Sequence, residues 1–266
     1  MYAFDYQRPD AVSAAAALLS ADPEAKALAG GQTLLPTLKQ RLAQPTALVD
    51  LSRIPELSGI CTTTEGVSIG AMTRHAEVAA SEVVRAAIPA LADLAGMIGD
   101  VAVRNRGTIG GSLANDDPTA DYPAAVLALN ATVVTDRRSI GASDFFRGLF
   151  ETALKEGEII TRVDFPKVEK AAYAKFRNPA SRYAMAGVFV AKTAAEVRVA
   201  VTGAGQSGVF LWTEAGDILG SDFTVQAVSG LALDPSNLMS DLHGSAEYRA
   251  QLAKVMLKRA LASITG

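Results

Sequence analysis

Short apolar runs, separated by glycine, proline and charged turns, divide the chain into three stretches with different patterns. The first stretch, residues 1–52, alternates brief β-type runs with segments of helical spacing. Asp10 precedes the first helical segment and is its predicted N-cap. The predicted elements are strands at 2–7, 26–29 and 47–51, helices at 11–20 and 34–41, and a turn or short helix at 54–57. This order predicts a small α/β unit.

The second stretch, residues 53–166, begins with a hairpin signal, because Glu65-Gly66 separates two β-type runs. Thr73 and Ser81 are predicted N-caps of the helices that follow. The predicted elements are strands at 59–63, 67–70, 131–134 and 158–165, helices at 74–80, 81–97 and 143–152, and loops at 99–111 and 112–120. The strand that ends at Pro166 closes this unit.

The third stretch, residues 167–266, follows a short charged segment that is typical of a domain boundary. Three strand-like runs come first, and the remainder is predicted to be helical. The strands are expected at 172–176, 186–193 and 196–201, and the last helix at 245–263 with an apolar stripe on one face. The pattern therefore predicts three units with boundaries at 52/53 and 166/167.

Composition narrows the class of protein. The chain has 266 residues, 49% hydrophobic and 20% charged, which is typical of globular proteins. A net charge of −3 gives no basic field for nucleic acid or an anionic membrane. Cys61 is the only cysteine, so the chain forms no internal disulfide and no cysteine-ligated iron–sulfur cluster. We find no signal-peptide pattern and no apolar run of membrane-spanning length, and we expect a cytoplasmic protein.

Two glycine pairs carry the main chemical signal. Ala29-Gly30-Gly31-Gln32-Thr33 and Thr108-Ile109-Gly110-Gly111-Ser112 each join adjacent glycines to a hydroxyl residue. Adjacent glycines allow several backbone N–H groups to approach an anion with no Cβ in the way. Two such loops in one chain predict a grip on the two phosphates of a dinucleotide.

Other candidate sites are weaker. Gly203–Gly208 matches G-x-G-x-x-G, but no parallel strand and helix follow it, so we interpret it as a strand-to-helix turn. His75 and His243 are far apart and are interpreted as structural or surface residues, which argues against hydrolase and zinc chemistry. Cys61 is expected to be a small buried hydrophobe. The acidic loop at 116–121 is interpreted as structural, and the role of Arg104-Asn105-Arg106 stays open.

The chain resembles the FAD-binding medium subunit of the molybdenum hydroxylases, the carbon monoxide dehydrogenase and xanthine dehydrogenase group. Family-like motifs occur in order over residues 1–258 and are specific in combination. They are Ala29–Pro36, Leu48–Leu51, Gly70–His75, Val103–Ala114, Asp117-Pro118, Ala120–Ala124, Asp144–Phe150 and Asp241–Ser245.

The resemblance implies an α+β fold: a two-part FAD-binding domain of the vanillyl-alcohol oxidase-like (PCMH) type, then a C-terminal α/β domain with a three-stranded sheet and helices. It assigns FAD to residues 29–34 and 108–112. By the same resemblance Asp121 is an acidic contact to the cofactor and Ile160 an apolar one. Lys175 and Tyr183 are expected beside the flavin ring. The implied cofactor-binding set is therefore Ala29, Gly30, Gly31, Gln32, Thr33, Leu34, Thr108, Ile109, Gly110, Gly111, Ser112, Asp121, Ile160, Lys175 and Tyr183.

The implied function is electron relay. Substrate is oxidised at a molybdopterin centre in a large subunit, electrons pass through [2Fe–2S] clusters in a small subunit, and FAD in this chain delivers them to an external acceptor. The implied assembly is a hetero-oligomer, a heterotrimer or a dimer of heterotrimers, and no catalytic acid or base is expected here. Backbone N–H groups of both glycine loops are expected to neutralise the pyrophosphate.

Two alternatives remain at this point. One is a stand-alone flavoprotein oxidoreductase of the same fold, and the other is an assembly module that has lost FAD. The intact glycine pairs argue against the second. As a test of the second loop, Gly110→Val is expected to lower FAD occupancy while the fold survives.

Overall fold

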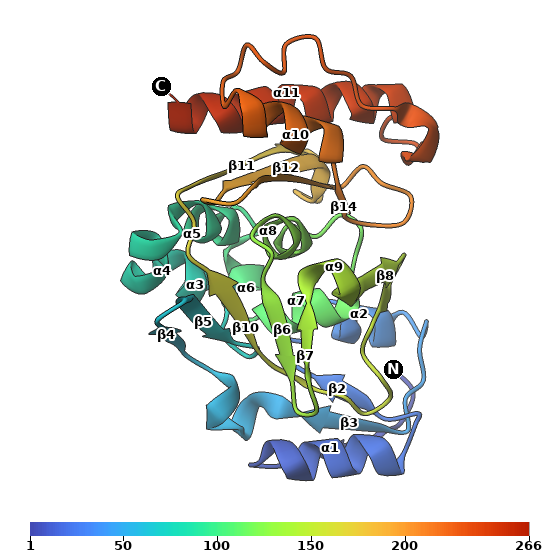
Figure 1. Ribbon diagram of the computed structural model, residues 1–266. Helices are drawn as coiled ribbons and strands as arrows, with labels where there is room; N and C mark the ends of the chain where they lie inside the picture. Colours follow the sequence, from blue (N-terminus) through green and yellow to red (C-terminus); the bar gives the residue numbers. More distant parts are fainter. Residues whose placement is uncertain (266) are drawn as a thin grey trace.

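A computed structural model describes residues 1–265 and stacks their elements in three layers (Figure 1). The N-terminal residues form the bottom layer, and the helix that ends the chain lies at the top. The fold is α+β, as predicted. Within the described residues, no helix is both long enough and apolar enough to cross a bilayer.

The bottom layer is a three-stranded parallel sheet in the order β1-β3-β2. Ala15 and Leu19 of helix α1 pack on Val49 of the central strand, so the alanine- and leucine-rich helix covers one sheet face. Asp10 does not cap α1: Ala11 occupies the N-cap position, and no side chain caps the helix. The elements are β1 (Asp5–Gln7), α1 (Val12–Ala21), β2 (Lys26–Leu28), α2 (Leu34–Lys39), β3 (Ala47–Asp50), η1 (Leu51–Arg53) and η2 (Pro55–Leu57).

The middle layer contains a five-stranded antiparallel sheet in the order β4-β5-β10-β6-β7. The predicted hairpin of β4 and β5 is confirmed. Strand β10 lies at the centre, where Val163 pairs with Ile69 on one side and with Val133 on the other. The strands are β4 (Ile60–Thr62), β5 (Gly66–Gly70), β6 (Thr132–Thr135), β7 (Ser139–Gly141) and β10 (Ile160–Pro166). Cys61 is exposed, so its prediction as a buried hydrophobe is wrong.

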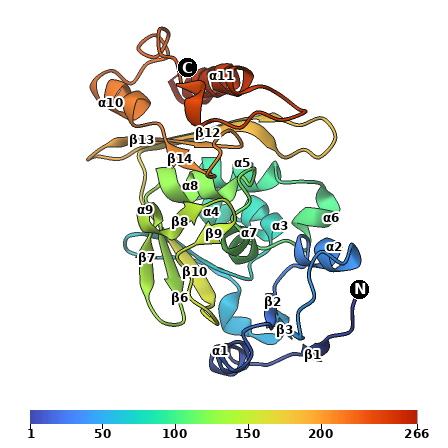
Figure 2. The same cartoon turned by 90° about the vertical axis from the view of Figure 1, so that its right-hand side faces the viewer.

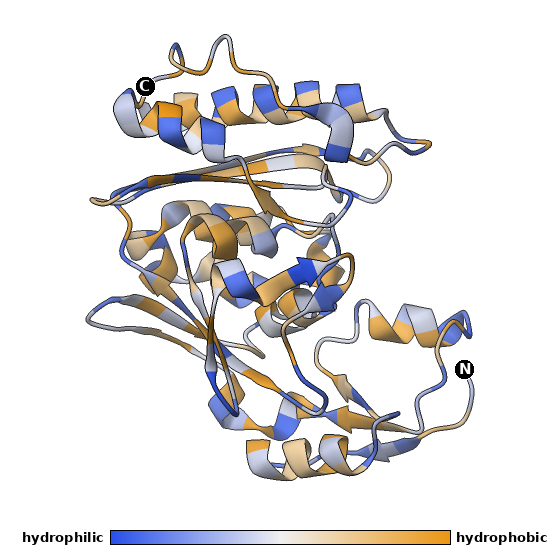
Figure 3. Cartoon of the chain, turned by 45° about the vertical axis from the view of Figure 1, so that its right-hand side comes forward, coloured by the Kyte–Doolittle hydropathy of each residue, from blue (hydrophilic) through white to orange (hydrophobic). Residues whose placement is uncertain are grey.

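Helices cover this sheet and carry most of the apolar core, and Figure 3 colours them mostly as hydrophobic. Ser81 caps α4 as predicted, because its hydroxyl accepts from the N–H of Val84. Two predicted loops contain helices instead, since Asp100 caps α6 and Thr108 caps α7. The helices are α3 (His75–Ala80), α4 (Glu82–Ala87), α5 (Pro89–Gly96), α6 (Val101–Arg104), α7 (Ile109–Asn115), α8 (Tyr122–Ala128) and α9 (Ala142–Phe145).

The helix predicted at 143–152 is also wrong. Only the four-residue α9 forms, and a small hairpin follows, of β8 (Phe146–Gly148) and β9 (Glu151–Thr152). Phe150 at the turn has a φ of 56°, a left-handed backbone that a continuing helix does not allow.

The top layer is a sheet in the order β11-β12-β13-β14 with α10 and α11 on its outer face. The three predicted strands are confirmed, but the sheet has four strands, because a two-residue strand after the glycine-rich segment adds to its edge. The elements are β11 (Lys170–Arg177), β12 (Ala184–Lys192), β13 (Val197–Thr202), β14 (Phe210–Leu211), α10 (Thr213–Ser221), η3 (Pro235–Asn237) and α11 (Ala246–Thr265).

Successive residues of β12 point to opposite faces of the top sheet, one covered by helices of the middle layer and the other by α11. Phe189 points into the core formed with α5 and α8, whereas Val188 and Val190 point into the core formed with α11. The sheet is therefore buried on both faces, which explains the nearly continuous apolar run over β12.

Candidate cofactor-binding site

A cavity of about 770 Å³ lies among residues of all three layers. Thirteen of the fifteen residues predicted to bind cofactor line it; the other two are Ile109 and Lys175. Its wall also includes the loop between β11 and β12, which Figure 2 shows projecting over α6 on the side where α2 lies. The volume falls in the range of cofactor sites. The residues that line the cavity and were predicted are Ala29, Gly30, Gly31, Gln32, Thr33, Leu34, Thr108, Gly110, Gly111, Ser112, Asp121, Ile160 and Tyr183.

The first glycine loop packs against Arg106 and Gly107, the residues just before the second loop. A Cβ added to Gly30 would lie 2.2 Å from the carbonyl oxygen of Arg106, so only glycine permits this contact. Gly31 has a φ of 71°, the left-handed region that glycine enters without a Cβ penalty. The glycines thus bring two segments together that are far apart in the sequence.

The two loops differ in what they offer an anion. In the first, the N–H groups of residues 30–34 donate to no acceptor within residues 1–265. In the second, Ile109 donates to Thr73, Gly110 to Ala71, and Gly111 to the hydroxyl of its own N-cap, Thr108. Ser112 donates to the carbonyl of Thr108, so four of the five N–H groups of the second loop are already used, and only that of Thr108 has no acceptor within residues 1–265. The second loop therefore offers fewer free N–H groups than expected. The second loop lines the cavity with two hydroxyl residues, Thr108 and Ser112, and with its glycines.

Gly110 has a packing role. A Cβ at this position would lie 2.5 Å from the Cβ of Ala71 and 2.8 Å from its carbonyl oxygen. Valine at 110 would therefore push α7 away from Ala71, the residue after β5, which argues against the expectation that the Gly110→Val fold survives intact.

Asp121 and Lys175 form a buried ion pair at the edge of the cavity. The Nζ of Lys175 lies 2.9 and 2.8 Å from the two carboxylate oxygens of Asp121, and the hydroxyl of Tyr173 donates to the same carboxylate. Burial raises the pKa of the Asp121 carboxyl, while the lysine and tyrosine oppose that shift. The Lys175 side chain is fully buried and does not line the cavity, whereas Asp121 does.

The acidic loop before Asp121 has the structural role that its sequence predicted. The carboxylate of Asp117 accepts from the N–H and the hydroxyl of Thr119. Asp116 is buried at a φ of 43°, and its Oδ1 has no hydrogen-bond partner among residues 1–265. Burial and the neighbouring charge of Asp117 raise the pKa of Asp116 to about 7.

His75 is a cavity residue that the sequence reasoning did not identify. It is buried between the glycine loops, and burial lowers its pKa to about 4, so the imidazole is neutral near pH 7. The backbone N–H of His75 donates to the carbonyl of Gly107, and the imidazole ring is tilted against Tyr122. The family-like motif Gly70–His75 could have identified His75 as a site residue, because this segment bonds to the second loop through the carbonyls of Ala71 and Thr73.

Tyr183 lies where the cavity meets solvent. Its side chain is 47% exposed, and it follows Arg182, which has a φ of 63°. The side chain of Asn178 accepts from the N–H groups of Ala180 and Ser181 and holds this loop in a tight turn. Burial and the charges of Asp117 and Asp121 raise the pKa of the Tyr183 phenol.

Comparison with known proteins agrees with this architecture. A family model for the FAD binding domain in molybdopterin dehydrogenase matches residues 2–168, and one for the CO dehydrogenase flavoprotein C-terminal domain matches residues 171–264. The carbon monoxide dehydrogenase medium chain of Hydrogenophaga pseudoflava is 38% identical over 97% of this chain and 96% of its own. The glyceraldehyde dehydrogenase medium chain of Sulfolobus acidocaldarius is 33% identical over 98% of both chains.

Solved structures give the same result. A chain of quinoline 2-oxidoreductase from Pseudomonas putida 86 superposes with a TM-score of 0.89 at 31% identity, over 98% of this chain and 96% of that one. A chain of the carbon monoxide dehydrogenase from Hydrogenophaga pseudoflava superposes with a TM-score of 0.85 at 35% identity, over 98% and 96%. The chain therefore belongs to the family of FAD-binding flavoprotein medium chains of the molybdopterin dehydrogenases.

Proposed function

We propose that this chain holds FAD in the cavity between its layers and serves as the electron-transfer subunit of a molybdopterin, iron–sulfur and flavin dehydrogenase. The observation that carries the proposal is the first glycine loop, where residues 30–34 line a cofactor-sized cavity and their five N–H groups have no acceptor within residues 1–265. Consecutive free amides in a glycine turn form a site for phosphate. FAD would supply the redox chemistry, and the chain would bind and orient it.

In this proposal each part of the cavity has its own task. The amides of residues 30–34 hold the pyrophosphate, the hydroxyls of Thr108 and Ser112 face it from the second loop, and Ile160 offers an apolar surface. Asp121 lines the cavity with Lys175 behind it, and Tyr183 stands at the mouth. The fifteen predicted residues, including Ile109 of the second loop, are thus the proposed cofactor site.

The ionised groups of the cavity favour relay over substrate turnover. Four acidic residues line the cavity: Asp121 is paired with Lys175 and Glu158 with Arg138, whereas Asp117 accepts from the N–H of Thr119 and Asp100 from the N–H of Val103. His75 is neutral near pH 7 and buried. A stand-alone oxidoreductase of the same fold needs a base with access to a substrate, and this arrangement offers less support for one.

We also propose the partners and the organisation of the chain. Relatives are named as medium chains or subunits of complexes, and the single cysteine places any four-cysteine cluster in another chain. The proposed assembly joins a large molybdopterin subunit and a small subunit with [2Fe–2S] clusters, as a dimer of heterotrimers. Within this chain the proposed domains are 1–52, 53–166 and 167–266. The cytoplasmic location stays a prediction.

The direct test is titration of the purified apoprotein with FAD, FMN and ADP, followed by flavin fluorescence or calorimetry. If the amides of residues 30–34 hold the pyrophosphate, FAD binds at least about a hundredfold more tightly than FMN. Equal affinity for FAD and FMN would contradict the loop assignment, and no flavin binding by chain or complex would end the proposal. Substrate turnover by the isolated chain would favour the stand-alone alternative.

A further inference from the structure

One wall of the cavity consists of residues without regular secondary structure. The segment between β9 and β10, residues 153–159, contains no helix or strand, and Leu154, Glu158, Ile159 and Ile160 line the cavity. No backbone ladder fixes the shape of such a segment. Three backbone hydrogen bonds hold it, from the N–H of Ala153 to Phe145, from the N–H of Glu158 to Lys155 and from the N–H of Asp136 to the carbonyl of Ile159. Its other polar contacts are made through side chains.

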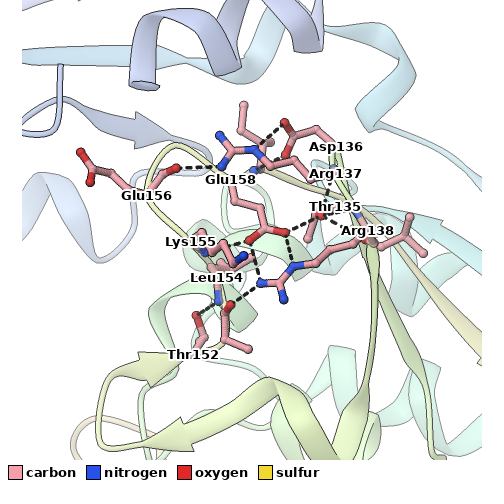
Figure 4. Close-up of polar contacts among 12 residues, drawn as sticks. Thr135, Asp136, Arg137, Arg138, Thr152, Leu154, Lys155, Glu156 and Glu158 are labelled. Atoms are coloured by element: carbon pink, nitrogen blue, oxygen red, sulfur yellow. Dashed lines mark hydrogen bonds and ion pairs between the residues drawn. The ribbon is translucent and has the colours of Figure 1, made fainter. Parts of the chain in front are cut away.

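Glu158 is at the centre of these contacts (Figure 4). Its side chain has no exposed surface. Oε1 accepts from the Thr135 hydroxyl at 2.7 Å and from Arg138 Nε at 2.9 Å. Oε2 accepts from Arg138 Nη2 at 2.9 Å and from the N–H of Lys155 at 2.8 Å. These bonds, led by the Arg138 guanidinium, lower the pKa of Glu158 to about 2.

Glu158 therefore belongs to the cavity wall, but its buried carboxylate is not free to bind a ligand. Two hydrogen bonds at each oxygen use the acceptor sites of an ionised carboxylate. Its contact with the N–H of Lys155 closes the segment on itself, three residues apart in the sequence. Glu158 shapes the wall and leaves cofactor contact to its neighbours.

The turn between β6 and β7 holds the same segment from outside. Arg138 Nη2 donates to the carbonyl of Ala153 at 2.6 Å, and Asp136 accepts from the N–H of Ile159 at 2.8 Å. Arg137 donates to the carbonyl of Glu156 and to the hydroxyl of Ser20, which lies in α1. The turn thus joins the cavity wall to the bottom layer.

We propose that Arg138 and Glu158 are positioning residues for FAD: their ion pair holds the wall 154–160 in the shape that the bound cofactor needs. The inference rests on the proposed FAD function. A preformed wall spares the cofactor the entropy of ordering a loop, so the pair acts on affinity without touching the ligand. A bidentate guanidinium fixes geometry that a lysine ammonium does not reproduce.

The test uses the full chain with Glu158→Gln, Arg138→Met and Arg138→Lys. Asp93→Asn is the matched control, because it removes one partner of the exposed Arg85–Asp93 ion pair. FAD dissociation constants are measured well below the melting temperature of each apoprotein. We expect them to rise about tenfold for Glu158→Gln and Arg138→Met, less for Arg138→Lys, and not for the control.

Amide hydrogen exchange of the apoprotein gives a second measurement that needs no cofactor. We expect faster exchange confined to residues 153–159, including the N–H of Lys155, in Glu158→Gln and Arg138→Met. FAD affinities within about twofold of wild type would overturn the inference, and so would unchanged or uniformly faster exchange. If the wild-type chain binds no FAD, the proposed function and the cofactor role fail together. The exchange pattern then still shows whether the pair orders the wall.

Discussion

At the scale of single residues, ionisation of the buried Asp116 lowers the free energy of unfolding. Its side chain is buried, one oxygen has no partner among residues 1–265, and Asp117 adds a like charge. The folded-state pKa of about 7 lies above the ordinary value of 3.8. As pH rises from about 4 through 7, the unfolded chain loses its proton first, so the free energy of unfolding falls.

We therefore expect Asp116→Asn to stabilise the protein at pH 8 relative to pH 5. Asparagine keeps the shape, tolerates the left-handed backbone at this position and carries no charge. The gain is at most about 4 kcal/mol, from three pKa units at about 1.4 kcal/mol each. Urea unfolding at both pH values checks this. Asp93→Asn, at an exposed position, should show no such difference, and an equal gain at both pH values would contradict the ionisation argument.

Gly31 offers a cleaner test of the first loop than Gly110 offers of the second. A Cβ on Gly31 meets the flexible end of Leu35 at 2.9 Å, and the left-handed φ costs about 1–2 kcal/mol in a residue with a Cβ. We expect Gly31→Ala to weaken FAD binding more than tenfold through displacement of the amides. Gly59→Ala is the control, because Gly59 also has a positive φ but has open space around it. Equal FAD affinity in the two variants would contradict the role of the first loop.

At the scale of elements, the ion pair between β11 and the residue before α8 holds the top layer to the middle one. Lys175 and Asp121 are both almost completely buried. Thr202 of β13 reinforces the contact, since its hydroxyl donates to the carbonyl of Ala120 at 2.6 Å. The acidic loop is therefore shaped by the C-terminal sheet as much as by its own sequence.

Lys175→Met should destabilise the protein by about 3–5 kcal/mol, because it leaves a buried carboxylate without its cation. The loss should be larger at pH 8 than at pH 5, since protonation of Asp121 relieves it. Thermal unfolding at both pH values measures the effect. The double variant Lys175→Met with Asp121→Asn should recover part of the loss. A double variant no more stable than the single one would show that packing, not charge, dominates.

At the scale of the whole molecule, the two parts matched by separate family models share one core. Phe189 of β12 is fully buried with residues of α5 and α8, and its ring stacks on Tyr173. Removing the C-terminal sheet would expose the faces of these helices. The two parts are thus expected to unfold together.

Phe189→Ala tests this coupling. We expect a loss of about 3–5 kcal/mol and one calorimetric transition at a lower temperature. Val188→Ala, on the opposite face of the same strand, is the comparison, because it faces α11. Two separate transitions in Phe189→Ala, with only one shifted, would contradict a shared core.

Much of the element order could be predicted from the sequence because local signals encode it. The hairpin at Glu65-Gly66, the cap at Ser81 and the three long C-terminal strands follow from turn chemistry, capping and apolar pattern. The failures occurred where local signals conflict. The glycines of α7 argue against a helix, yet Thr108 caps one there. The helix start predicted at Ser143 gives only the four-residue α9, which has no side-chain cap and is followed by a hairpin.

The sequence by itself determined the glycine loops, the single cysteine and the family-like motifs, because each of these is a matter of residue type and spacing. Only the tertiary structure showed which loop keeps free N–H groups, since that depends on acceptors at Ala71 and Thr73 that another segment supplies. The same holds for Asp121 with Lys175 and for Glu158 with Arg138. Partners distant in the chain leave no local pattern, so folding alone decides whether a carboxylate is free to bind or already bound.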